Sequence, residues 1–167
     1  MNPPAATIRT AQVSDAEAIA ALTTQLGYEV EPSAVADRLS RLLSRNDQQF
    51  LIADDDGRAV GWIHMVIAEF VESGAFVVIG GLVVDRDHRK QGIGRRLLAH
   101  AEAWAVKNGC SIIRLWSSSR RTEAHRFYER IGYTNIKTQY SFMKSLDGAG
   151  SDAFRGFVPD VTSPGAS

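Results

Sequence analysis

The segment from Arg89 to Arg96 combines cations and glycines in a pattern that can hold a phosphate group. It reads Arg-Lys-Gln-Gly-Ile-Gly-Arg-Arg, follows an apolar run that ends at Val84, and opens an amphipathic helical pattern from Ile93 to Lys107. The first N–H groups of a helix lack acceptors inside the helix, and the helix dipole adds partial positive charge there. Glycine lets the backbone approach a bulky anion closely. The segment predicts a diphosphate-binding loop, the alternative being an ordinary tight turn from strand to helix.

Two well-known phosphate loops do not fit this segment. The P-loop requires Lys and then Ser or Thr after its last glycine, whereas two arginines follow Gly94. The dinucleotide-binding fingerprint requires a third glycine at the position of Leu97. The pattern that remains is Arg-x-x-Gly-x-Gly, which Arg89, Gly92 and Gly94 form.

A second segment, from Arg121 to Tyr133, reads R-T-E-A-H-R-F-Y-E-R-I-G-Y. Together the two segments resemble the GNAT superfamily of N-acetyltransferases, whose pyrophosphate loop is Arg-x-x-Gly-x-Gly and whose later motif is a helix with Ala, Phe-Tyr, Gly and an aromatic residue. The resemblance spans roughly Thr7 to Leu146. The matching residues of the later motif are Ala124, Phe127, Tyr128, Gly132 and Tyr133.

The resemblance implies an α/β (α+β) fold with a mixed, largely antiparallel central sheet, helices on both faces, and a bulged, splayed fourth strand. It implies direct transfer of an acetyl group from acetyl-CoA, as co-substrate, to a primary amine through a ternary complex. The residues expected to bind acetyl-CoA are Leu82, Val83 and Val84 by their backbone, the loop Arg89, Lys90, Gln91, Gly92, Ile93, Gly94, Arg95 and Arg96, and also Arg121 and Phe127.

The resemblance places Tyr128 near the sulfur, where its hydroxyl can act as general acid. The alternatives are a core tyrosine or one that only orients the sulfur. Many relatives carry a glutamate about where Gly80 stands, so no base can be carried over. Glu69 is the candidate base chosen here by its order in the chain, while Glu72 and His64 stay open, as does a water chain to bulk solvent.

The acceptor is predicted to be a small molecule: an amine metabolite, an amino-acid derivative or an aminoglycoside-like compound. Relatives often have asparagine where this chain has Arg121. A second arginine precedes it, and two arginines favour an acidic acceptor group, the alternative being a solvated loop. A protein or peptide amine is another acceptor class. A different kind of protein, a non-catalytic acyl-CoA sensor, also stays open.

Size and composition narrow the remaining classes. A chain of 167 residues with 44% hydrophobic residues predicts one domain, 7–146, followed by an extended tail, 147–167. Zero formal net charge argues against nucleic acid as partner, and no apolar run is long enough for a membrane span. The histidines lack metal-ligand spacing, and the single Cys110 predicts a buried thiol. We expect a cytoplasmic protein without a metal, and a homodimer stays open.

The elements that must position these residues follow from periodicity. Ser14, with Glu17 as a capping box, predicts a helix that ends at Gly27, and Pro32 predicts the start of a second helix. Thr122 predicts the start of the helix that carries Tyr128. Gly80-Gly81 predicts a bulge or a close backbone approach. The predicted strands are Thr7–Arg9, Phe50–Ala53, Val60–Ala68, Phe76–Val84, Ser111–Trp116, Tyr133–Ile136 and Gln139–Leu146.

Overall fold

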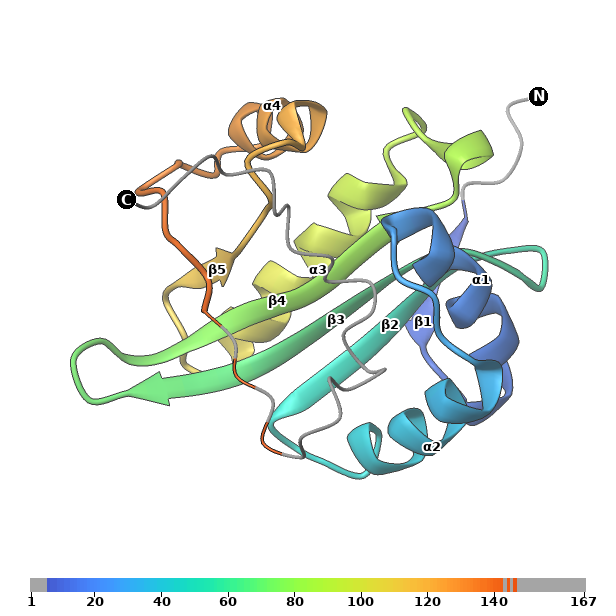
Figure 1. Cartoon of the computed structure of the whole chain (residues 1–167). Coiled ribbons are helices and arrows are strands. Elements are labelled where there is room, and N and C mark those ends of the chain that lie inside the picture. The colour runs from blue at the N-terminus through green and yellow to red at the C-terminus, as the bar shows by residue number, and fades with distance from the viewer. Residues whose placement is uncertain (1–5, 143, 145, 147–167) are drawn as a thin grey trace.

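The computed structural model of the chain describes residues 6–142, 144 and 146, so the predicted tail lies outside the described residues. A five-stranded sheet runs through the centre with the strand order β1-β2-β3-β4-β5 (Figure 1). All neighbours are antiparallel except β4 and β5, which are parallel. The strands are β1 (Thr7–Thr10), β2 (Gln48–Asp55), β3 (Arg58–Phe70), β4 (Gly74–Val84) and β5 (Ile113–Leu115).

Helices cover both faces of this sheet, as predicted. Helices α1 and α2 lie on one face and α3 on the other, and α4 lies beside the β5 edge (Figure 1). Their bounds are α1 (Ala16–Leu26), α2 (Pro32–Leu42), α3 (Ile93–Lys107) and α4 (Thr122–Arg130), with short 3-10 helices η1 (Val13–Asp15) and η2 (Arg86–His88). None of the helices in the described residues is long and apolar enough to cross a membrane.

The sheet divides the buried side chains into two clusters. One cluster, the α3-side core, contains Ile63, Met65, Val77 and Ile79 from the sheet together with the buried residues of α3. The other, the α1–α2-side core, joins alternate residues of the same strands to α1 and α2; its members include Ile52, Trp62, Val83, Ile19 and Leu39. This two-sided burial explains the long apolar runs of β3 and β4, because both faces of these strands are covered.

Strand β4 contains the predicted bulge. His64 of β3 pairs with Gly81, but the next residue, Met65, pairs with Ile79, so Gly80 is the extra residue in β4. A bulge of this kind turns two consecutive residues toward the same face. A Cβ on Gly81 would lie 2.6 Å from the Trp62 ring, and a Cβ on Gly80 would lie 3.0 Å from Nδ1 of His64. Gly81 is thus required by the close approach of a bulky neighbour.

The two predicted strands at the end of the domain are absent from the described residues. Tyr133–Ile136 and the described part of Gln139–Leu146 form no ladder, and Tyr140 and Phe142 are 93% and 92% exposed. Alternating apolar residues favour an extended backbone, but a strand also requires backbone hydrogen bonds with a neighbour. The pattern could not show whether that neighbour is in place, and β5 pairs here with β4 alone.

The start of α1 also differs from the prediction. The capping box forms two residues earlier than Ser14 and Glu17: the Gln12 N–H donates to the Asp15 carboxylate at 2.7 Å. This interaction starts η1, and α1 continues from it. The Asp15 carboxylate, and not the Ser14 hydroxyl, starts the helix because the carboxylate is also held in place by two hydrogen bonds from Arg9, each 2.8 Å long. The end of α1 at Gly27, which lies in the left-handed region, and the start of α2 at Pro32 are as predicted.

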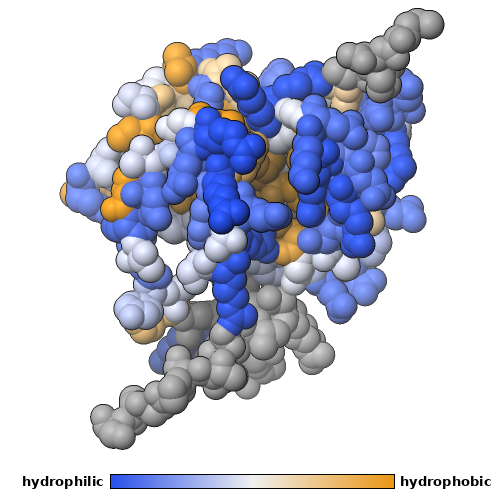
Figure 2. All heavy atoms as spheres, turned by 90° about the horizontal axis from the view of Figure 1, so that it is seen from above, coloured by the Kyte–Doolittle hydropathy of each residue, from blue (hydrophilic) through white to orange (hydrophobic). Residues whose placement is uncertain are grey.

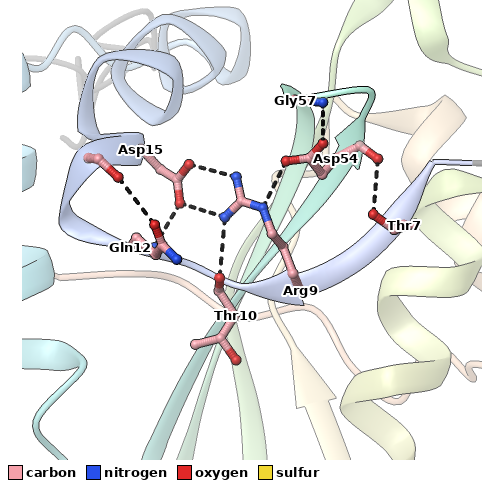
Figure 3. A network of polar contacts seen from close by, with 8 residues as sticks. Thr7, Arg9, Thr10, Gln12, Asp15, Asp54 and Gly57 are labelled. Carbon is pink, nitrogen blue, oxygen red and sulfur yellow. Dashed lines mark hydrogen bonds and ion pairs between the residues drawn. The ribbon is translucent and has the colours of Figure 1, made fainter.

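Arg9 joins three elements at the β1 edge of the sheet (Figure 3). Its guanidinium binds Asp15 at the start of α1, and its Nε donates at 2.7 Å to Asp54 in β2. Asp54 also accepts the Gly57 N–H of the β2–β3 turn at 2.7 Å. Both carboxylates are largely covered, and the hydrogen bonds from Arg9 hold the pKa of each below its ordinary value.

Replacing Arg9 by Met is expected to lower the free energy of unfolding by about 1–2 kcal/mol at neutral pH. The folded pKa values of Asp15 and Asp54 lie below their unfolded values, so their contribution is complete at neutral pH. It is lost as the pH falls below about 4 through those folded values. Urea unfolding of both proteins at pH 7 and near pH 2.5 measures the difference.

The matched control is Arg45→Met, which removes an ion pair to Asp47 in which both side chains are well exposed. Exposed pairs contribute little, so the control should unfold like the parent protein. An Arg9→Met difference that is equal at both pH values would show that packing of the arginine stem, and not the ion pairs, gives the stability.

Candidate functional site

Strands β4 and β5 separate toward their C-terminal ends, which leaves a gap between them where both strands lead into loops. The two strands pair only over Val77–Ile79 and Ile113–Leu115, so the stretch from Gly80 to Val84 has no strand partner on that side within the described residues. This is the splay expected for the fourth strand. Backbone groups of Leu82 to Val84 can therefore bind an extended ligand as a neighbouring strand would.

The predicted phosphate loop lies at the end of β4 and leads into α3. Gly92 is the N-cap of α3 with φ +81°, and the first helical hydrogen bond runs from the Arg96 N–H to its carbonyl at 3.0 Å. The N–H groups of Ile93, Gly94 and Arg95 precede that bond and are left without an intrahelical acceptor. Nothing in the described residues lies within 4 Å of a Cβ position on Gly92. The loop thus offers open space, N–H donors and exposed cations to an anion.

Arg89 turns back onto the strand. Its Nε donates to the carbonyl of Val84 at 3.2 Å, so this arginine ties the loop to the end of β4. The remaining side chains are disposed differently: Lys90, Gln91 and Arg95 are exposed and Arg96 is half-buried. Lys90 has φ +62°, a left-handed conformation that residues other than glycine seldom adopt. The carbonyl of Val84 is occupied by Arg89, whereas this residue was predicted to contact the ligand by its backbone.

Asp85 is a structural residue of this loop that the sequence reasoning missed. It is buried, and its carboxylate accepts the Asp87 N–H at 2.9 Å and contacts Nδ1 of His88 at 3.2 Å. Gln25 of α1 also binds it, and the same amide accepts the Arg86 N–H at 2.9 Å. An Asp directly after an apolar strand and before a polar turn was the available signal.

The second motif reaches the first through Phe127. Its ring carbon Cζ lies 3.3 Å from the Cβ position of Gly94, so a side chain on this glycine would require the Phe127 ring to shift. Tyr128 packs half-buried against the α3-side core, 5.3 Å from the Phe127 ring and 5.8 Å from the Tyr133 ring. Burial raises the pKa of Tyr128, and the nearby charge of Arg121 lowers it in part. The hydroxyl is therefore protonated at neutral pH and can donate.

Arg121 connects the start of α4 to the end of α1. It is the N-cap residue of α4, and its guanidinium donates a short hydrogen bond to the carbonyl of Leu26, the last residue of α1. A cation at a helix C-terminus is favoured by the helix dipole. Viewed from above, apolar atoms lie at the bottom of a hollow with hydrophilic side chains around it, between the α4 side and the α1 side (Figure 2).

Glu69 is not brought together with these residues. It is exposed near the β3–β4 hairpin, where it pairs with Ala75, five positions along β3 from His64. At about 3.3 Å per residue, that separation is roughly 16 Å. Glu72 lies in the hairpin turn and is exposed as well. His64, in contrast, lies against the Gly80 bulge.

The chain is similar to known acetyltransferases over most of its length. The family model described as "Acetyltransferase (GNAT) family" matches residues 16–133. The aminoalkylphosphonate N-acetyltransferase of Salmonella typhimurium is 30% identical over 145 residues, which cover 86% of this chain and 93% of that protein. An aminoglycoside N(6')-acetyltransferase type 1 of Klebsiella aerogenes is 29% identical over 120 residues, which cover 68% and 77% of the two chains.

Solved structures agree on the fold. An aminoglycoside N-acetyltransferase crystallised with CoA superimposes with a TM-score of 0.76 at 21% identity, over 86% of this chain and 99% of that one. The 6'-N-acetyltransferase of Acinetobacter haemolyticus gives a TM-score of 0.73 at 19% identity, over 84% and 99%. With the Arg-x-x-Gly-x-Gly loop, the splayed β4 and the family match in one chain, the protein is a member of the acetyltransferase (GNAT) family of N-acetyltransferases.

Proposed function

We propose that this protein transfers the acetyl group of acetyl-CoA directly to the primary amine of a small molecule. The observation that carries the proposal is the meeting of the two motifs, with Phe127 of α4 against Gly94 at the start of α3, beside the gap between β4 and β5. The diphosphate binds the N-terminus of α3, and the pantetheine arm lies along Leu82 and Val83. The thioester then reaches the region between Gly80 and Tyr128.

The acceptor that the site favours is a small amine with an anionic group. Arg121 lies at the N-terminus of α4, where the helix dipole adds to its charge, and it acts on Tyr128 electrostatically. Guanidinium groups bind phosphonate and carboxylate oxygens with two parallel hydrogen bonds. The relative that acts on aminoalkylphosphonates supports the same class. The sensor alternative is disfavoured because binding alone makes no use of a tyrosine hydroxyl that can donate a proton to the thiolate.

Thiol release from acetyl-CoA with a panel of amines tests the proposal. The panel contains aminoethylphosphonate, amino acids, a polyamine, an aminoglycoside and short peptides, with ethylamine as the matched acceptor that lacks the phosphonate. Aminoethylphosphonate should exceed ethylamine in kcat/KM by at least about tenfold, which corresponds to 1.4 kcal/mol.

If aminoglycosides are the only amines of the panel that are acetylated, the acceptor is polycationic and the proposal of an anionic acceptor is wrong. Tight binding of acetyl-CoA by calorimetry without turnover of any amine would favour the sensor alternative. Lack of acetyl-CoA binding would contradict the proposed function altogether.

A further inference from the structure

His64 has an environment that no other histidine of the described chain shares. Its ring lies half-buried on the α1–α2 side of the sheet and stacks on Phe50 with a centroid distance of 5.5 Å. Its Nε2 lies 2.9 Å from Oε1 of Gln48 in the neighbouring strand. Its Nδ1 lies 3.0 Å from the position that a Cβ on Gly80 would take. Because residue 80 is a glycine, the imidazole of His64 can occupy the space that a side chain at this position of the bulge would fill.

The contact with Gln48 matches one tautomer of the ring. Oε1 of Gln48 faces Nε2 and an amide oxygen only accepts, so the contact is a hydrogen bond in the tautomer that carries the proton on Nε2. The lone pair of the neutral ring is then on Nδ1, which faces the exposed backbone of Gly80. A neutral imidazole held with its basic nitrogen toward an open position is the arrangement that a general base requires.

The faces of β4 separate this group from Tyr128. His64 stacks on a member of the α1–α2-side core, whereas Tyr128 packs against the α3-side core. The gap between β4 and β5 begins after Ile79, next to Gly80. A thioester that enters this gap along β4 therefore ends between the two side chains. An amine can approach it from the His64 side while the sulfur faces the Tyr128 side.

We propose that His64, oriented by Gln48, is the general base that removes a proton from the acceptor amine. This assignment rests on the proposed function. The acceptor arrives as an ammonium ion, and Nδ1 takes one proton. The amine lone pair forms the C–N bond, the C–S bond breaks with its electrons on sulfur, and Tyr128 protonates the thiolate. The second amine proton returns to Tyr128 through solvent, and His64 releases its own to solvent. The products are the amide, the CoA thiol and one proton.

The surroundings of His64 keep the ring neutral. The residues it meets are Gln48 and Phe50 on β2 and Gly80, with Gly81 as its pairing partner, on β4. None of the four is charged, and burial lowers the pKa of His64. The ring is thus unprotonated at neutral pH and ready to accept a proton. Glu69, the base chosen from the sequence, lies far along β3 and does not face it.

Three substitutions test the assignment, with the best acceptor of the panel above. His64→Ala should lower kcat/KM about 10²–10⁴-fold at pH 7 and leave the affinity for acetyl-CoA unchanged. Gln48→Glu places a carboxylate next to Nε2, raises the pKa of the imidazole, and should move the acidic limb of the pH–rate profile to higher pH. His64→Ala combined with Gly80→Glu supplies a carboxylate at the vacated position and should recover part of the lost rate. His100→Ala, on the exposed face of α3, is the matched control and should change nothing.

The outcomes separate this assignment from the proposed function. Amine turnover that survives in His64→Ala, with the limb unmoved in Gln48→Glu, overturns the role of His64 and leaves the acetyltransferase activity intact. Failure of the parent protein with every amine overturns the proposed function, and the base assignment with it. If His64→Ala does not fold, as judged by urea unfolding, the Gln48→Glu profile decides alone.

Discussion

Replacing Gly92 by Glu is expected to weaken acetyl-CoA binding on the order of 100-fold, about 2.8 kcal/mol. Gly92 is the N-cap of α3, and the space beside it is open in the described structure. A carboxylate there would stand among the N–H groups that we assign to the diphosphate. It would satisfy those donors itself and repel the phosphates, so both effects act against the ligand. Isothermal calorimetry with acetyl-CoA measures the change.

Gly92→Ala is the matched control for backbone strain. Both variants place an L side chain at φ +81°, so both lose a similar amount of stability, about 1 kcal/mol. Only the glutamate adds the charge, and the alanine should keep most of its affinity. Equal affinities of the parent, the alanine and the glutamate variants would show that the diphosphate does not bind at this helix.

Removing the hydroxyl of Tyr128 is expected to lower kcat on the order of 10²–10³-fold while acetyl-CoA binds as before. Tyr128 is half-buried and its hydroxyl is protonated at neutral pH, and a departing thiolate benefits from a proton because a free thiol has a pKa of about 8.5. Tyr128→Phe keeps the ring that packs against Phe127, so the fold should persist. Steady-state kinetics with the preferred acceptor, together with calorimetry, measures the two quantities.

Tyr133→Phe is the matched control. Its hydroxyl donates to Glu102 at 3.1 Å, on the outer side of α3, and its ring lies 5.8 Å from that of Tyr128. Removing this hydroxyl disturbs the same aromatic cluster without touching the thioester. If both variants lose kcat equally, packing of the cluster is responsible. If Tyr128→Phe keeps full kcat, the tyrosine has no role as general acid.

The backbone of the proposed coenzyme side of the site could be predicted from the sequence because its signals are local. The helix bounds Ile93–Lys107 were correct to the residue, since apolar periodicity fixes the helix and the left-handed Gly92 fixes its start. The bulge in β4 followed from two adjacent glycines in an apolar strand. In each case the type of one or two residues restricts the local backbone conformation, independently of contacts with distant parts of the chain.

The acceptor side could not be predicted in the same way. His64 and Gln48 are 16 residues apart, and only the register of β2 on β3 brings them together. Glu69 and His64 stand on the same strand, and sequence order alone could not tell which one lies at the bulge. The strands predicted after Tyr133 failed for a related reason, because pairing depends on a neighbour that local sequence does not specify.

The sheet divides this enzyme into two layers that can change independently. The α3 layer carries the loop and Phe127, and the α1–α2 layer carries His64 and Trp62; the two communicate through the backbone of β3 and β4. Under the proposed function, substitutions in the second layer can change which amine is admitted while the first layer continues to bind acetyl-CoA. Specificity for a new acceptor can then arise through substitutions on one face of the sheet alone, without a loss of acetyl-CoA binding in the intermediate variants.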